Sequence, residues 1–410
     1  MSTNQTNVFN ALDSILNPEN ITSSGMSLTN NQSEGIPSGL ISEIIQIPSV
    51  SQCQLGSLFV IDIKETNILL NNITLAFTTQ AGVTGVTATT VGLAPFVYSF
   101  SRIELVVNNI VIDSLYSNFQ HIIQNTLNYD HDRAHINQAW GAYDQVTKRN
   151  SLASGSNTYF VNLQCFVDQI KFPIFNSSHT LQLRIYMNNL SDILTTTGTV
   201  TGTGVCNLTC LAVCKITRLP PLLSQQKLSS LINRPVSRFF HSTSYGLYTL
   251  QSGASNYQIV LSAIVGKCAQ LTFVVRKTSE LTGENSFKYQ KIKDFSILNS
   301  SSINITGGVA VTSELALKHL SLYWNRSSIA TETADGVTNN NQYIYSWCFS
   351  SDNLTAIESG RLLGSKTFQG NESLIINFSS ATTVNYQVEV YCLMENVLTI
   401  GGNFVTKASA

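Results

Sequence analysis

Two histidines stand four residues apart in the polar segment "NYDHDRAHINQ", at His131 and His135. On a helix this spacing places both imidazoles on one face, which is how zinc metalloproteases hold their metal. Such a site also needs a third ligand and a glutamate after the first histidine. This chain has Asp132 there, with a carboxyl group one methylene shorter. The polar, loop-like surroundings favour a solvated or intersubunit loop over a metal site.

Three cysteines recur at every fourth position, at Cys206, Cys210 and Cys214. On a helix they could form a soft metal site. On a strand they share one face with Leu208 and Ala212, because strand side chains alternate between faces, and that face would be a core stripe of small residues. The sequence contains no CxxC pair. We therefore predict a buried strand here, and buried free thiols for most of the eight cysteines.

Other patterns that could support chemistry are weak or missing in the sequence. It contains no GxSxG, GxGxxG or GK[ST] motif, and "SGRLLGSK" (359–366) resembles a phosphate loop only loosely. Basic residues stand beside aromatic ones in "RPVSRFFHS" (234–242), and two more basic residues begin "RKTSE" (276–280). These residues could contact nucleic acid, but they are too few to indicate a binding surface. No carboxylate pair stands in an apolar setting. We expect a protein that is not an enzyme, with no catalytic residues, cofactor, metal or specific nucleic-acid binding.

The charge content points to assembly. Charged residues make up 11% of the chain, against about 25% in typical globular proteins, and 23 basic residues nearly balance 24 acidic ones. This balance argues against non-specific electrostatic binding to nucleic acid or anionic membranes. A surface with few charges suits burial against partners. We expect no transmembrane segment and no signal peptide, because no long apolar run or basic leader is visible.

The apolar pattern is that of a β protein. Val, Ile, Thr, Phe and Tyr are plentiful, and strand-like runs alternate with turn residues. Gly/Thr-rich stretches at 80–92 and 195–204 are expected to be surface loops. Asn108-Asn109 tolerates the left-handed turn of a tight hairpin.

Helical spacing interrupts the strand pattern once in each half of the chain. The first such segment is 113–127, with Asp113 or Ser114 as the expected N-cap, and the second is 312–325. Each helix should pack one apolar face against a neighbouring element.

The two halves follow one order of elements. Each has a strand, an Asn/Ser turn and an Ile-x-Ile return, at 102–112 and at 292–305. Each then has its single amphipathic helix, a polar loop and a run of strands, and ends on a long closing strand, at 205–216 or 384–394. We therefore predict an all-β fold of two tandem eight-stranded jelly rolls, a double jelly roll, with one short helix in each.

The predicted domain organisation has four parts. They are a flexible N-terminal arm (1–37), jelly roll 1 (38–216), a connector (217–235) and jelly roll 2 (236–410). The arm contains one apolar patch, "VFNALDSIL", which could form a short amphipathic helix against a neighbour. Plain disorder of the arm is the alternative.

Several segments resemble the double jelly-roll major capsid proteins of eukaryotic double-stranded DNA viruses, of the polinton-like virus, virophage and large DNA virus type. In the first half they are "FSRIELVVNNIVIDSLYSNFQHIIQ" and "YFVNLQCFVDQIKFPIFNSSHTLQLRIYM". In the second half they are "IESGRLLGSKTFQGNESLIINFSS" and "YQVEVYCLMENVLTIGGNFV". The second half carries the family's Ser-Gly-x-x-x-x-Ser segment, from Ser359 to Ser365, and a closing tail similar to the family's, Asn396-Val-Leu398-Thr-Ile400-Gly-Gly402. The likeness spans about residues 38 to 405, and the compact length implies that long tower loops are absent.

This resemblance implies a structural protein of the virion. In the family, chains assemble as homotrimers, which are pseudo-hexameric capsomers, and these tile an icosahedral capsid. The expected partners are neighbouring capsomers, penton and minor capsid proteins, and the arm would contact a neighbour or the inner layer. The expected location is the capsid shell, after synthesis in the cytoplasm or nucleus of the host cell and without secretion.

Two other functions fit a protein with paired jelly rolls. One is a glycan amidase, which would need acidic and aromatic residues gathered between the domains and is usually exported. The other is a fibre, receptor-binding or glycan-binding β protein, which would more often show many short repeats. The two long repeats favour the capsid interpretation.

Overall fold

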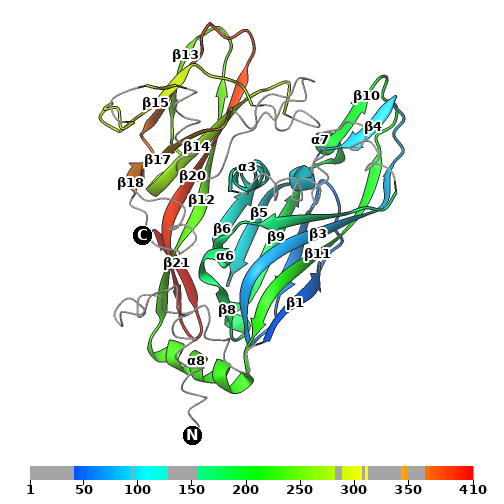
Figure 1. The fold of residues 1–410 in the computed structure, drawn as a ribbon, viewed down its shortest axis with the longest axis vertical. Coiled ribbons are helices and arrows are strands. Elements are labelled where there is room, and N and C mark those ends of the chain that lie inside the picture. Colours follow the sequence, from blue (N-terminus) through cyan, green and yellow to red (C-terminus); the bar gives the residue numbers. More distant parts are fainter. Residues whose placement is uncertain are drawn as a thin grey trace.

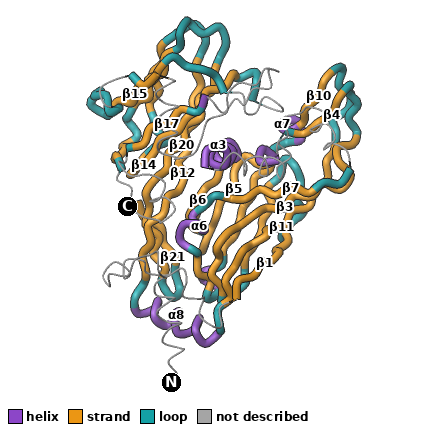
Figure 2. Tube along the Cα trace, viewed as in Figure 1, coloured by secondary structure: helices purple, strands orange, loops and turns teal. Residues whose placement is uncertain are grey.

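The computed structural model describes residues 41–94, 96–127, 155–281, 289–306, 310–312, 343–349 and 365–409. Four sequence predictions lie wholly or almost wholly outside these ranges: the N-terminal arm, the His131–His135 segment, the second helix at 312–325, and the loose phosphate-loop match at 359–366. The described part is mostly strand, with a few short helices between the strands (Figure 2).

Jelly roll 1 consists of a five-stranded and a four-stranded antiparallel sheet. The first sheet has the order β1 (Ile41–Pro48), β11 (Val205–Arg218), β3 (Ile68–Thr84), β7 (Thr158–Leu163), and the short β8 (Phe172–Ile174) also pairs with β3. The second has the order β2 (Leu58–Ile63), β9 (Leu181–Met187), β5 (Phe100–Val107), β6 (Ile110–Tyr116). Strands that are distant in sequence alternate with one another in both sheets, which is the strand order of a jelly roll.

Jelly roll 2 repeats this strand order. One sheet runs β12 (Val236–Leu250), β20 (Tyr386–Ile400), β14 (Val265–Lys277), β17 (Tyr345–Cys348), with β18 (Lys366–Gln369) on β14 and β21 (Val405–Ser409) on β20. The other runs β13 (Asn256–Val260), β19 (Ser373–Asn377), β15 (Asp294–Leu298), β16 (Val311–Thr312). The predicted double jelly roll is therefore confirmed, and the long closing strands of the two halves are β11 and β20.

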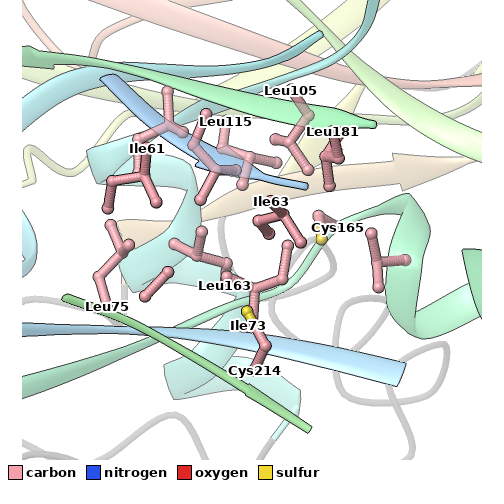
Figure 3. Close-up of a cluster of buried hydrophobic side chains, with 14 of the residues drawn as sticks. Ile61, Ile63, Ile73, Leu75, Leu105, Leu115, Leu163, Cys165, Leu181 and Cys214 are labelled. Atoms are coloured by element: carbon pink, nitrogen blue, oxygen red, sulfur yellow. The ribbon is translucent and has the colours of Figure 1, made fainter. Parts of the chain in front are cut away.

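The core of jelly roll 1 lies between its two sheets. Figure 3 shows aliphatic side chains from both sheets meeting there, from Ile73 and Cys214 on one side to Ile61 and Leu105 on the other. Along β11 every second residue from Cys206 to Ile216 is buried, as strand alternation requires. The cysteine stripe is thus a core stripe as predicted, and all eight cysteines are free and buried.

Two turn and helix predictions have different outcomes. The hairpin between β5 and β6 is confirmed, since Asn108 and Asn109 both adopt left-handed backbone angles, with φ of 49° and 64°. The helix predicted at 113–127 begins later, as α3 (Ser117–Leu127). Residues 113–116 continue β6 instead, because they pair with β5, so Asp113 and Ser114 do not cap the helix. The local helical spacing was overridden by pairing with a neighbouring strand.

The predicted loops at 80–92 and 195–204 are partly strand. β3 extends to Thr84, and β4 (Thr90–Leu93) pairs with β10 (Leu194–Thr197) in a separate two-stranded sheet. Threonine has a high strand propensity, so a threonine-rich segment forms a strand where a second strand is available to pair with it. Jelly roll 1 also has helical turns that the sequence did not predict: α6 (Phe166–Ile170), α7 (Leu190–Ile193), η1 (Phe96–Ser99) and η2 (Ser177–His179).

The two jelly rolls stand side by side and are linked by α8 (Pro221–Asn233) at one end (Figure 1). Pro221 occupies the first turn of α8, where a proline costs no hydrogen bond. The end of β12 nearest α8 lies against α6 and β6 of jelly roll 1, and β21 also lies against β6. At the opposite end the two jelly rolls diverge, with α3 between them.

Candidate functional site

The junction between the jelly rolls is built first from apolar contacts. The central strands β14 and β20 are buried on both faces: Phe273 and Val390 point into the core of jelly roll 2, and Val274 and Tyr391 point outward. The outward face is covered by α3 of jelly roll 1. The buried side chains at this contact are Phe119, Ile122, Ile123, Val274, Tyr289, Ile344, Tyr391 and Leu393.

The spacing along α3 explains why it fits this sheet. Phe119, Ile122 and Ile123 are three and four residues apart, so they lie on one face of the helix. The ring of Phe119 stacks on that of Tyr391, with centroids 4.8 Å apart and planes at 11°. The predicted amphipathic helix therefore holds the two jelly rolls together.

A buried ion pair stands beside this apolar contact. Arg276 Nη1 lies 2.7 Å from Glu389 Oε1, with side chains only 5% and 4% exposed. The other carboxylate oxygen accepts hydrogen bonds from Asn118 of α3 and from the Tyr391 hydroxyl, both at 2.5 Å. Burial alone would lower the pKa of Arg276, but the adjacent carboxylate outweighs this and raises it. Asn118 thus ties jelly roll 1 to a charge pair in jelly roll 2.

Near α8, side chains of jelly roll 1 complete the backbone hydrogen bonds of jelly roll 2. Gln169 of α6 accepts from the His241 N–H at 2.8 Å and donates to the His241 carbonyl at 3.1 Å. Asn176 donates to the Gly402 carbonyl at 2.8 Å. The two Gln169 hydrogen bonds cover the outer edge of β12 at His241, and a covered edge cannot add a strand from another chain.

A second pair of charged residues connects β6 to the last described strand. The Asp113 carboxylate is buried and accepts from the backbone N–H groups of Ser114 at 2.9 Å and Phe166 at 3.2 Å. Lys407 donates from Nζ to the Ile112 carbonyl at 2.7 Å and to the Ser242 hydroxyl at 3.1 Å. Burial raises the pKa of Asp113 and lowers that of Lys407, and the opposite charge of each opposes the shift of the other.

All three histidines in the described part of the chain are buried at this junction: His121, His179 and His241. Nε2 of His179 lies 2.7 Å from the Gly401 carbonyl of jelly roll 2. Neither ring nitrogen of His241 has a partner among the described residues. Burial lowers the pKa of each imidazole, and that of His121 falls to about 3. The junction therefore holds its histidines in the neutral form.

Where the jelly rolls diverge, they enclose an open cleft of about 310 Å³. Jelly roll 1 contributes Tyr116 and Asn188 to its lining, among others, and jelly roll 2 contributes Tyr245 and Gln387. Tyr116 and Tyr245 stack across the boundary with ring centroids 4.4 Å apart. The Arg276–Glu389 pair forms part of the floor.

The structure places the candidate residues from the sequence in structural roles where it describes them. The three regularly spaced cysteines line a core. The basic segment 234–242 enters β12, where Phe240 is buried in the core of jelly roll 1. No cluster of three potential metal ligands occurs among the described residues. The searched helices include none long and apolar enough to span a bilayer.

Sequence reasoning missed the buried charges at the junction. Arg276 ends the apolar run "LTFVV" and Glu389 interrupts "YQVEVYCL". A charge inside an otherwise apolar strand is a usable signal, because buried charges need a partner. The sequence did not indicate which charges pair, since Arg276 and Glu389 are more than a hundred positions apart.

Known proteins resemble this chain in their fold and not in their sequence. No protein-family model matches the chain, and no curated protein does either. Among solved structures, PBCV-1 VP54, fitted into a reconstruction of the virophage Sputnik, superposes with a TM-score of 0.68 at 13% identity, covering 90% of this chain and 97% of that one.

Two further solved structures cover nearly the whole chain. The Faustovirus major capsid protein has a TM-score of 0.64 at 9% identity, covering 98% of this chain and 100% of that one. A chain from the Sputnik virophage structure has a TM-score of 0.58 at 11% identity, covering 94% and 91%. The protein therefore has the double jelly-roll fold found in viral major capsid proteins.

Proposed function

We propose that this protein is a major capsid protein, which self-assembles as homotrimers to build an icosahedral shell. The observation that carries the proposal is the junction itself. Two jelly rolls of identical strand order are held as one block by α3, by a buried ion pair and by hydrogen bonds along the edge of β12. A rigid block of two equivalent units can occupy two neighbouring positions of a six-membered ring. Three chains then form a pseudo-hexameric capsomer.

The trimer contact follows from the repeat. In jelly roll 2 the outer face of the β12–β20–β14–β17 sheet is covered by jelly roll 1. The equivalent face of jelly roll 1 carries an apolar row that runs across neighbouring strands. It consists of Phe160, Ala76, Leu211 and Pro48, paired in that order. Phe160 at one end of the row is 46% exposed.

A second copy of the chain is the proposed occupant of this face. Jelly roll 2 of the second copy would cover the apolar row on jelly roll 1 of the first copy. This contact would resemble the one within each chain, where jelly roll 1 covers the equivalent face of jelly roll 2. Such a head-to-tail contact forms a closed ring when the rotation closes. With two equivalent units per chain, a ring of six units contains three chains. Threonine and asparagine flank the row, at Thr74, Thr78 and Asn162, and suit a neutral contact with few charges to desolvate.

The alternative functions gain less support. A glycan amidase needs a carboxylate that is free to act, and Glu389 in the cleft is already paired with Arg276, Asn118 and Tyr391. The capsid assignment implies the virion shell as the location, synthesis inside the host cell, and neighbouring capsomers, penton and minor capsid proteins as partners.

The test is the mass of the purified protein by light scattering, with negative-stain imaging of the same peak. We expect a particle of three times 44.9 kDa with a hexagonal outline. Phe160→Glu should convert the trimer to monomer and leave the fold intact, because the side chain is exposed. Val260→Glu, at a residue 50% exposed on β13, is the matched control and should stay trimeric. A monomeric wild-type protein would overturn the proposal.

A further inference from the structure

The cleft between the diverging ends of the jelly rolls has the composition of a binding site for a neutral polar ligand. Its volume of about 310 Å³ is at the lower end of the range for small-molecule sites, roughly 300–1,000 Å³. Hydroxyl and amide groups surround the opening, including those of Ser101, Asn188 and Gln387. These groups come from both jelly rolls, so the site exists only in the assembled junction.

The charges in the cleft disfavour an anionic ligand. The positive charge of Arg276 is matched by Glu389 at 2.7 Å. Asp192 adds a further carboxylate to the lining and is held by the backbone and side-chain amides of Asn189, at 3.1 and 3.3 Å. The lining therefore has no excess of positive charge to offer a phosphate or a carboxylate. A ligand that binds here gains by hydrogen bonding and by packing.

One donor in the floor lacks an acceptor. Arg276 lines the cleft with a side chain only 5% exposed, and its Nε has no partner among the described residues. A buried donor without a partner costs free energy, about 1–3 kcal/mol in typical proteins. The other two nitrogens of the Arg276 guanidinium group already bind Glu389 and the Leu281 carbonyl.

An aromatic surface lies beside these polar groups. The Tyr116 and Tyr245 rings are stacked at 26° and are half-buried, so each joins an apolar ring to a polar hydroxyl. A pyranose ring has the complementary arrangement, with C–H groups on its faces and hydroxyls around its edge. From the paired tyrosines and the amide rim, we propose that the cleft binds a neutral sugar residue of a glycan.

The experiment is saturation-transfer difference NMR on the purified full-length protein. The probes are glucose, galactose, mannose and N-acetylglucosamine, with glucuronate as the anionic comparison. We expect saturation transfer to the ring protons of at least one neutral sugar, and weaker transfer to glucuronate than to glucose. Tyr245→Ala should reduce the transfer by about fivefold, as expected for the loss of a stacked aromatic contact.

A second variant keeps the test valid if the tyrosine also supports folding. Gln387→Ala removes one rim amide, leaves the stacked rings in place and should also reduce the transfer. Gln258→Ala is the matched control, because Gln258 is an exposed glutamine of jelly roll 2 outside the cleft lining. Absence of transfer to all four neutral sugars, or equal transfer in all three variants, would overturn the proposal. The trimer mass is measured separately, so this result leaves the shell function untouched.

Discussion

Gln169 forms both hydrogen bonds that the backbone of His241 would otherwise make with a neighbouring strand. Its side-chain oxygen accepts from the His241 N–H at 2.8 Å, and its nitrogen donates to the His241 carbonyl at 3.1 Å. The amide of one side chain in jelly roll 1 thereby takes the place of a strand beside β12 in jelly roll 2.

Replacing Gln169 by alanine should destabilise the junction. Two backbone polar groups of β12 would lose their partners, and each such loss costs about 1–3 kcal/mol when the group stays buried. The measurement is the free energy of unfolding by urea, followed by circular dichroism. Gln46→Ala, at an exposed residue of β1, should change it by less than about 0.5 kcal/mol. Equal values for the two variants would show that Gln169 is not needed.

Removing one partner of the Arg276–Glu389 pair should lower the free energy of unfolding more than removing both charges does. Arg276→Met leaves the Glu389 carboxylate buried without its counter-charge, and we expect a loss of about 3–5 kcal/mol. The double variant Arg276→Met/Glu389→Leu should lose less stability than Arg276→Met alone, and a double-mutant cycle of unfolding free energies measures the coupling between the two residues.

A surface ion pair in the same jelly roll provides the comparison. Lys277 Nζ lies 3.3 Å from Glu280, with both side chains partly exposed. Lys277→Ala should therefore change stability by less than about 1 kcal/mol. If Arg276→Met proved as mild as Lys277→Ala, the buried pair would contribute little to the junction.

The buried histidines should make the fold sensitive to acid. Burial lowers the pKa of His121 from 6.5 to about 3, so between these values the unfolded chain binds a proton that the folded chain does not. Stability is therefore lost as the pH falls below 6.5, at up to about 1.4 kcal/mol per pH unit for one such group, and is unaffected by His121 above about pH 7.5.

A carboxylate opposes this effect at lower pH. Burial raises the pKa of Asp168 to about 6, so below pH 6 the folded chain gains a proton there before the unfolded chain does. The His121 contribution is isolated by comparing wild type with His121→Gln, measuring unfolding free energy from pH 7.5 to 5. The variant should lose less stability on acidification. Parallel pH profiles of the two proteins would contradict the assignment.

The cysteines should be unreactive in the native protein. All eight are free and buried, and burial raises the pKa of Cys53 and Cys214 to about 12, so almost no thiolate is present at neutral pH. Iodoacetamide labelling read by mass spectrometry should add no label to the folded protein and eight after denaturation in guanidinium. Rapid native labelling of any cysteine on β11 would contradict its place in the core.

The sequence determined the strands, the repeat and the cysteine stripe. Alternation of apolar and polar residues is a local property, and it identified the face that Cys206, Cys210 and Cys214 share. The Asn108-Asn109 turn was equally predictable from the sequence, because few other residues tolerate two successive left-handed conformations. The common order of elements in the two halves then indicated two jelly rolls.

Only the tertiary structure decided which residues form the junction. The helix start moved from Asp113 to Ser117 because residues 113–116 found a partner in β5, which no helical spacing could reveal. Likewise, Lys407 and the Ile112 carbonyl, or Asn118 and Glu389, are more than two hundred residues apart and meet only when the two jelly rolls pack together. Local patterns report which face of a strand is buried, whereas the partners of buried polar groups depend on how the two folded halves pack together.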